Sequence, residues 1–281
     1  MGELVYKVSR NTKLEEFLRK DAGISKRMIS RLKRTENGIT RNGELIRTID
    51  MVYKDDLILL KYEDSKILQS NENLSVKIAF QNENLVVFDK PVGMPVHPSI
   101  KHQGDTLGNF FAYKFPTLTF RPINRLDRDT SGLCIVAKNA ISASALQNNI
   151  EKIYYAVVTG EISGSGTINF PIAREKESII KRVVRSDGQE SITHYKTIIS
   201  GEKYSFLEIK LETGRTHQIR VHFSHIGHPL AGDDLYGGSL DDISCQALHC
   251  GQLIFKEPIT GEIITVKSSI REDMKNLIKE A

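Results

Sequence analysis

The alternation of apolar and polar residues predicts a strand-rich domain from about residue 74 onward. The runs with the pattern of strands are 76–80, 85–88, 154–159, 193–199 and 206–211. Helical patterns cover 142–150 and a segment after Thr216. Strands joined mostly by hairpins lack the regular alternation with helices that marks a doubly wound sheet. We therefore expect an α+β domain with a mainly antiparallel, mixed sheet.

The pattern before residue 70 predicts a separate, smaller unit. Thr12 and Glu15 have the spacing of a capping box, which predicts a short helix to about residue 20. Ser25 can cap a second helix whose apolar residues share one face, and strand-like runs follow at 39–41 and 57–60. The sequence thus predicts a small α/β module at 1–68, a linker at 69–77 and a second domain at 78–281.

Basic side chains crowd the second of these helices. They are Lys26, Arg27, Arg31, Lys33 and Arg34. The net charge of +4 is modest, but its concentration near the N-terminus matters more than its sum when the partner is a polyanion. Such a stripe is typical of a solvated helix face and also of an RNA-binding surface, and charge alone does not decide between them.

Composition limits the class of protein. The apolar share of 40% and charged share of 26% are those of a globular chain with a sizeable core. No stretch approaches the roughly 20 apolar residues of a membrane-spanning helix, and no export signal is visible. Three cysteines do not make a disulfide framework and fit a reducing compartment. We expect a cytoplasmic protein that does not associate with membranes.

Two polar segments are candidates for chemistry. Residues 124–132 gather two carboxylates and two arginines directly before the apolar strand-like run 133–137. Such a loop is a good place for function, although surface ion pairs could equally explain it. The second segment, 213–222, contains the start of a predicted helix, which Thr216 can cap and which ends at Gly227.

Four histidines in and after the second segment raise the possibility of a metal site. They are His217, His222, His225 and His228. Catalytic zinc helices of the HExxH type need two histidines at i and i+4 with an intervening glutamate, and this pattern does not occur here. Histidines that are structural or face RNA are the better interpretation, so we expect no metal.

Three motifs together resemble the RluA family of pseudouridine synthases in order and spacing. They are 90–98 (KPVGMPVHP), 124–132 (NRLDRDTSG) and 214–222 (GRTHQIRVH). The segments 227–237 and 247–249 also look like that family, so the resemblance covers roughly 75–270. Residues 10–65 resemble the S4 RNA-binding module, including the turn at Arg41-Asn42-Gly43. One departure is Asn124, where the family more often has histidine.

The resemblance implies a pseudouridine synthase fold and specific roles. By resemblance Asp127 is the catalytic nucleophile and Arg220 is its partner, while Tyr154 packs on the target base. Arg125 can enter the RNA stack that the flipped uridine leaves. An aspartate suits such covalent catalysis because an ionised carboxylate can attack a carbon and later leave, without metal or cofactor. Whether it attacks ribose C1′ or the base stays open.

The expected partner is structured RNA, with large-subunit ribosomal RNA first and transfer RNA second. We expect Arg41 and the basic helix to bind RNA, together with Arg215 and His217 of the third motif. The protein is expected to be a monomer. The competing classes are a non-catalytic RNA-binding protein, against which the set of Asp127, Tyr154 and Arg220 speaks, and a metal-dependent hydrolase that uses the histidines.

Overall fold

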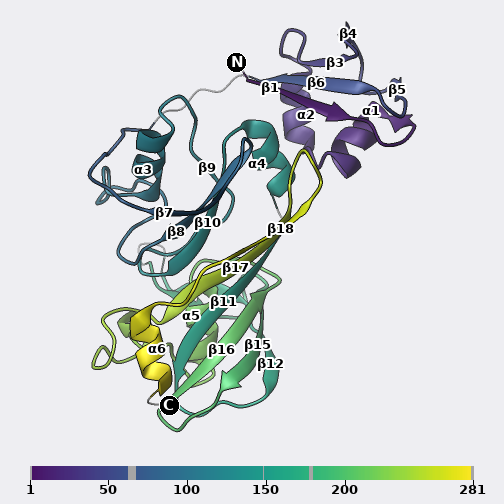
Figure 1. The fold of residues 1–281 in the computed structure, drawn as a ribbon. Coiled ribbons are helices and arrows are strands. Elements are labelled where there is room, and N and C mark those ends of the chain that lie inside the picture. The colour runs from purple at the N-terminus through teal and green to yellow at the C-terminus, as the bar shows by residue number, and fades with distance from the viewer. Residues whose placement is uncertain (1, 63–67, 148, 177–179, 280–281) are drawn as a thin grey trace.

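A computed structural model describes residues 2–62, 68–147, 149–176 and 180–279, and Figure 1 shows them as a small N-terminal unit and a larger unit. In the described residues the larger unit is built on a ten-stranded sheet with the order β12-β15-β16-β11-β17-β10-β8-β7, β18 pairing with β17 and β9 with β10. Its strands are β7 (Lys77–Gln81), β8 (Leu85–Lys90), β9 (Arg121–Pro122), β10 (Ser131–Ala137), β11 (Ile150–Thr159), β12 (Ser165–Asn169), β15 (Ile192–Ile199), β16 (Tyr204–Leu211), β17 (Leu248–Lys256) and β18 (Ile263–Lys267).

The remaining elements of the larger unit surround this sheet. They are the hairpin of β13 (Ile172–Arg174) and β14 (Arg182–Val184), the helices α3 (Leu107–Lys114), α4 (Ala140–Leu146), α5 (Gln218–His225) and α6 (Glu272–Lys279), and the 3₁₀ turn η2 (Asp234–Tyr236). Leu85, Phe88, Ile135 and Leu207 are among the fully buried residues of the core on the sheet.

The strand directions confirm the expected α+β class with a mainly antiparallel sheet. Among the described strands of this sheet, β10 and β17 are the parallel pair, with Ser131 opposite His249, and the other pairings are antiparallel. The expected strands all occur, with ends that differ by a few residues. In the described residues, no helix has both the length and the apolar character needed to cross a membrane.

The N-terminal unit has its own sheet and core. Its strands are β1 (Gly2–Lys7), β2 (Thr12–Lys13), β3 (Ile39–Arg41), β4 (Glu44–Leu45), β5 (Met51–Val52) and β6 (Leu57–Tyr62), and its helical elements are α1 (Leu14–Glu16), the π-helical η1 (Phe17–Asp21) and α2 (Lys26–Leu32). Four strands pair in the order β1-β6-β3-β4. Leu14, Leu18, Leu32, Ile58 and Leu60 belong to the buried cluster between helices and strands.

The N-terminal unit packs directly against the larger unit. Ala140 and Ile141 of α4 belong to the same buried cluster as the N-terminal core, and Ile259 from the turn between β17 and β18 packs against it. The Ser25 main-chain N–H donates to Ser144 Oγ at 2.7 Å. Figure 1 shows α4 and the β17–β18 turn reaching toward this unit. The two units therefore share apolar contacts as well as a connection.

The predicted linker is attached to the larger unit where it is described. Asn109 Nδ2 donates to the Gln69 carbonyl at 2.8 Å, and Asn71 Nδ2 donates to the Gly104 carbonyl at 2.6 Å. Residues 63–67, at the end of the predicted module, lie outside the described residues. Gln69 and Asn71 are thus hydrogen-bonded to the larger unit.

The N-terminal ends of two helices show which of the expected capping residues the structure confirms. Ser25 caps α2 as expected, since its Oγ accepts from the Met28 main-chain N–H at 3.3 Å. The expected capping box at Thr12 is wrong. Thr12 pairs with Val52 as part of β2, and Lys13 takes the N-cap position without a side-chain hydrogen bond. Pairing with a distant strand has overridden the local capping signal.

Two other helix expectations need correction. The helix expected at 142–150 is α4, which begins earlier because Asn139 Oδ1 accepts from the Ser142 N–H at 2.7 Å, and it ends at Leu146. Thr216 does not cap α5. The N-cap residue is His217 in the left-handed conformation, with φ of 58° and no side-chain cap. Gly227, with φ of 87°, follows the end of α5 as expected.

Candidate active site

The loop before β10 carries Asp127 and is fixed by hydrogen bonds on both sides of this residue. Asn124 Oδ1 accepts from the Ile135 N–H at 2.9 Å, and its Nδ2 donates to the Leu133 carbonyl at 3.0 Å. The Thr130 N–H donates to the Asp127 carbonyl at 3.2 Å and closes a tight turn. Asn124 thus has a structural role at the position where the resembling family more often has histidine.

Gly132 lets the end of this loop approach β17 closely. Its φ is 103°, and a Cβ atom there would lie 2.3 Å from the Cys250 main-chain oxygen. A side chain is therefore excluded both by the backbone conformation and by the neighbouring strand. The loop that holds Asp127 is pinned to the centre of the sheet.

Lys90, at the end of β8, is hydrogen-bonded to the same loop through its side chain. Its ammonium group donates to the carbonyls of Pro91, Met94 and Arg128 at 2.8, 2.7 and 3.0 Å. The residue is 1% exposed, and burial lowers the pKa of Lys90 to about 8. The three N–H bonds of the ammonium match three carbonyls, so this side chain connects the first and second motifs.

Lys90→Met is expected to lower the free energy of unfolding by about 2–3 kcal/mol, because buried carbonyls lose their donor. The folded-state pKa of Lys90 lies below its value of 10.5 in the unfolded chain. The unfolded chain then binds more protons between these values, so the wild type gains stability as pH rises through this range. Urea unfolding at several pH values should show the gap to the variant widening above about pH 8. A gap that narrows there would contradict this assignment.

Arg220, on α5, joins two carboxylates. Its Nε and one terminal nitrogen donate to Asp233 at 2.7 Å each, and its other terminal nitrogen donates to Asp127 Oδ2 at 3.2 Å. Asp233 is fully buried, and the Arg220 side chain is nearly so. Burial acts to lower the pKa of Arg220, but the bonds and charges of Asp233 and Asp127 outweigh it, so the guanidinium stays charged.

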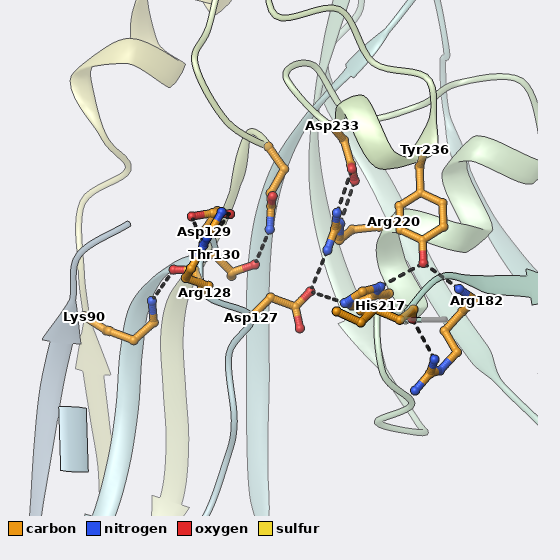
Figure 2. Close-up of polar contacts among 12 residues, drawn as sticks. Lys90, Asp127, Arg128, Asp129, Thr130, Arg182, His217, Arg220, Asp233 and Tyr236 are labelled. Carbon is orange, nitrogen blue, oxygen red and sulfur yellow. Dashed lines mark hydrogen bonds and ion pairs between the residues drawn. The ribbon is translucent and has the colours of Figure 1, made fainter. Parts of the chain in front are cut away.

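Tyr236 and His217 complete this cluster (Figure 2). The Tyr236 ring lies 4.9 Å from the Arg220 guanidinium carbon, within the range of a cation–π contact. The Tyr236 hydroxyl is 2.8 Å from His217 Nδ1, and it accepts from the Arg182 main-chain N–H at 2.9 Å. His217 Nε2 lies 3.7 Å from Asp127 Oδ2.

A pocket opens beside Asp127 and brings together residues from distant parts of the chain. Those with expected site roles are Arg125, Asp127, Tyr154, Arg215, His217 and Arg220, and apolar walls include Leu126, Leu211, Ile219 and Leu248. Burial raises the pKa of the Tyr154 hydroxyl well above 10, so the ring remains neutral. The pocket combines an apolar face, one carboxylate and several cations, which suits a flat polar ring attached to a phosphate backbone.

The residues expected to bind RNA fall into separate places. Arg125 is exposed at the mouth of the pocket, and Arg215 lines both this pocket and a neighbouring hollow that also includes Arg174 and Arg182. The basic residues on and after α2 are all exposed on the N-terminal unit: Lys26, Arg27, Arg31, Lys33 and Arg34. Arg41 is half-buried and donates to the Met51 carbonyl at 3.0 Å, so it also fixes a loop.

The histidines in and after the third motif have separate partners. His222 is buried and contacts Thr193 Oγ1 and the Phe170 carbonyl, each at 2.9 Å. His228 Nδ1 lies 3.0 Å from the Thr159 carbonyl, and the His225 ring packs against Phe170. Only His217 of the four lies against Asp127 among the described contacts.

Sequence reasoning gave no role to Lys90, Asp233 or Tyr236. Lys90 lies in the first motif, and Asp233 and Tyr236 lie in the segment 227–237, so each was within a recognised pattern. Their types carried a usable signal, since a lysine, an aspartate and a tyrosine among glycines and prolines are candidates for polar contacts. Their partners, however, come from other parts of the chain.

Comparisons with known proteins agree with this arrangement. Residues 84–225 match the RNA pseudouridylate synthase family. The chain is 35% identical to the uncharacterized RNA pseudouridine synthase YjbO of Bacillus subtilis, over 92% of this chain and 96% of that protein. It is 34% identical to ribosomal large subunit pseudouridine synthase D of Pseudomonas aeruginosa, over 84% of this chain and 81% of that protein. Among solved structures, human RNA Pseudouridylate Synthase Domain Containing 1 superposes with a TM-score of 0.57 at 25% identity, covering 73% of this chain and 94% of that one.

Proposed function

The chain belongs to the RluA-type family of RNA pseudouridine synthases, and we propose that it uses Asp127 as the nucleophile to isomerise uridines of large-subunit ribosomal RNA. The observation that carries this proposal is the position of the Asp127 carboxylate. It lies in the pocket, 3.2 Å from the buried guanidinium of Arg220, on a loop that Lys90 and Asn124 fix from both sides.

The reaction breaks the bond from ribose C1′ to N1 of uracil and rejoins the base through C5, and nothing is oxidised or added. A carboxylate can serve because it forms a bond to an electrophilic carbon and later leaves from it. Arg220 places a positive charge beside Asp127 and donates a hydrogen bond to Oδ2 at 3.2 Å, which orients the carboxylate for attack. Both routes, through C1′ or through the base, need this ionised oxygen in the pocket.

The target uridine must leave its helical stack to reach Asp127. Extrusion costs a few kcal/mol, which stacking of the base on an aromatic ring and filling of the vacated space can offset. Tyr154 lines the pocket with a neutral ring, and Arg125 lies exposed at its mouth. We propose that Tyr154 packs on the flipped base and that Arg125 fills the gap in the RNA.

The names of relatives support ribosomal RNA as the substrate. Besides the Pseudomonas protein, a relative from Haemophilus influenzae is also called ribosomal large subunit pseudouridine synthase D, at 33% identity. Release of tritium from C5-labelled RNA tests the activity, because the C5 hydrogen is lost when C5 joins the ribose. Large-subunit ribosomal RNA should release tritium, and release from transfer RNA alone would contradict the proposed substrate.

We propose that the N-terminal unit is an RNA-binding module of the S4 type that occupies residues 1–68. Its exposed basic residues lie on and after α2. Because the N-terminal unit packs on α4 of the larger unit, it would hold RNA at a fixed distance from the pocket. Deletion of the unit would expose Ala140 and Ile141. Substitution of charges is therefore the cleaner test.

The combined variant Lys26→Gln, Arg27→Gln and Arg34→Gln is expected to weaken RNA binding and flatten its salt dependence. Removing one cation that pairs with a phosphate lowers the slope of log K against log salt by about 0.7–0.9 units. Filter binding at several salt concentrations measures the slope. The matched control replaces three other exposed lysines, Lys196, Lys267 and Lys279, with glutamine. Equal slopes for both variants would exclude the proposed role of α2.

A further inference from the structure

The two oxygens of the Asp127 carboxylate have different surroundings. Arg220 donates to Oδ2 at 3.2 Å, and His217 Nε2 lies 3.7 Å from the same oxygen. Among the described residues, no side chain or main-chain group bonds to Oδ1. Figure 2 shows both contacts meeting at one oxygen while the other points away from them. The protein thus distinguishes the two oxygens before any substrate is bound.

The contacts of Tyr236 determine where the proton of His217 sits. The Tyr236 hydroxyl accepts from the Arg182 main-chain N–H at 2.9 Å and lies 2.8 Å from His217 Nδ1. A proton on Nδ1 would make the hydroxyl accept twice and leave its own hydrogen without an acceptor among the described residues. The hydroxyl therefore donates to Nδ1, and the neutral ring carries its proton on Nε2, facing Asp127.

The backbone at His217 is held in an unfavourable conformation. Its φ of 58° is left-handed, which costs about 1–3 kcal/mol for a residue other than glycine and persists when the surroundings fix it. Gln218 fixes this turn, since its Oε1 accepts from the Arg215 N–H and from Thr213 Oγ1 at 2.9 Å each. The imidazole is almost fully covered, with 8% of the side chain exposed. The strain places the ring between Tyr236 and Asp127.

We propose that His217 is a positioning residue for Asp127: with its tautomer set by Tyr236, it holds Oδ2 together with Arg220 and leaves Oδ1 to react with RNA. This inference rests on the proposed function, in which Asp127 is the nucleophile. The distance of 3.7 Å is longer than a hydrogen bond, and the proposal requires that the N–H close this gap when RNA fills the pocket, as catalytic contacts that are long without substrate often do.

Several charged groups surround His217 and set its protonation. Asp127 faces it from the loop before β10, Arg220 from α5 and Arg182 from β14, while Asp233 lies just before η2. Burial is the main effect and lowers the pKa of His217 below its ordinary value of 6.5, with Arg220 and Arg182 acting in the same direction and the two carboxylates opposing them. The neutral form therefore prevails at neutral pH. At acidic pH the imidazolium pairs with Asp127 and slows its attack.

The test compares two amides that differ by one methylene group. His217→Gln can reach Asp127 with its N–H, whereas His217→Asn tolerates the left-handed backbone but is too short. Single-turnover tritium release is measured on C5-tritiated RNA from cells lacking the enzyme. The Asn variant should be slower by about 10²-fold, as when a preorganised donor is removed, and the Gln variant by no more than about tenfold. Equal rates for the two variants would overturn the inference.

A double-variant cycle tests the role of Tyr236. Tyr236→Phe keeps the ring beside Arg220 and removes the hydroxyl, so it should slow the wild type about tenfold and the His217→Gln protein less than about twofold. If Tyr236→Phe slowed the wild type and the His217→Gln protein by the same factor, Tyr236 would not act through His217. The wild-type rate should also fall at acidic pH, on the acid side of the ordinary histidine pKa of 6.5 because burial lowers the pKa of His217, and this fall should be absent in His217→Gln. An identical acid limb in both proteins would also refute the proposal.

Two controls separate this inference from the proposed function. His225→Gln, at an exposed histidine of α5, should match the wild type in rate. Asp127→Asn is assayed alongside. If Asp127→Asn is active, the proposed function fails. If it is inactive while folded His217→Asn works at the wild-type rate, only the role of His217 fails.

Discussion

Asp127→Asn is expected to abolish isomerisation, with a loss of at least about 10⁴-fold in the single-turnover rate, while RNA binding is retained. The amide keeps the shape of the carboxylate but has no negative charge with which to attack. The loop itself is held by Lys90 and Asn124 rather than by the Asp127 side chain, so its path should persist. Binding and chemistry should therefore separate in this variant.

Tritium release and filter binding on the same RNA measure the two properties. Asp129→Asn is the matched control, because Asp129 lies two residues away, is exposed to a similar extent and pairs with Arg128 at 2.9 Å instead of lining the pocket. Loss of that pair should cost no more than about 1 kcal/mol of stability. If Asp127→Asn protein turned over at a rate near that of Asp129→Asn, the nucleophile would be misassigned.

Arg220→Met should affect both stability and activity. The buried Asp233 carboxylate loses its cation, and such an unpaired charge costs about 3–5 kcal/mol of unfolding free energy. Asp127 also loses its hydrogen-bond donor, so the rate falls as well. Urea unfolding and tritium release give the two effects separately.

Arg220→Lys keeps the charge and serves as the second variant in case the methionine protein does not fold. An ammonium group cannot reproduce the planar fork that donates two bonds to Asp233 and a third to Asp127. We expect a folded protein slowed by about 10²-fold. A lysine variant with the wild-type rate would mean that Arg220 contributes charge alone. Full activity in the methionine variant would mean that Arg220 has no role in catalysis.

Local patterns predicted the strands and the start of one helix, whereas the caps expected at Thr12 and Thr216 were wrong. Alternating patterns located the strands of the large sheet, and Ser25 marked the start of α2. The second and third motifs meet at one pocket, which their order in the chain did not require. This meeting depends on the strand order β16-β11-β17-β10, which relates the end of β16, just before the third motif, to the start of β10, at the end of the second.

Contacts between distant segments were beyond the reach of local reasoning. The bridge from Arg220 to Asp233 and the stacking on Tyr236 depend on how the segment 227–237 folds back onto α5. His217 was expected to contact RNA, and the structure places it against Asp127. Lys90 had no role in the sequence analysis, whereas its 1% exposure and its bond to the Arg128 carbonyl make it an internal support of the loop that carries Asp127. Each of these roles arises from burial, which local sequence patterns report poorly.

Mapping of pseudouridines in total RNA tests the central claim most directly. A strain that lacks this protein is compared with strains in which the wild type or Asp127→Asn is restored at equal level. We predict that particular pseudouridines of large-subunit ribosomal RNA disappear in the deletion strain, return with the wild type and remain absent with Asp127→Asn. Their return with Asp127→Asn, or an unchanged set of pseudouridines in the deletion strain, would contradict the account.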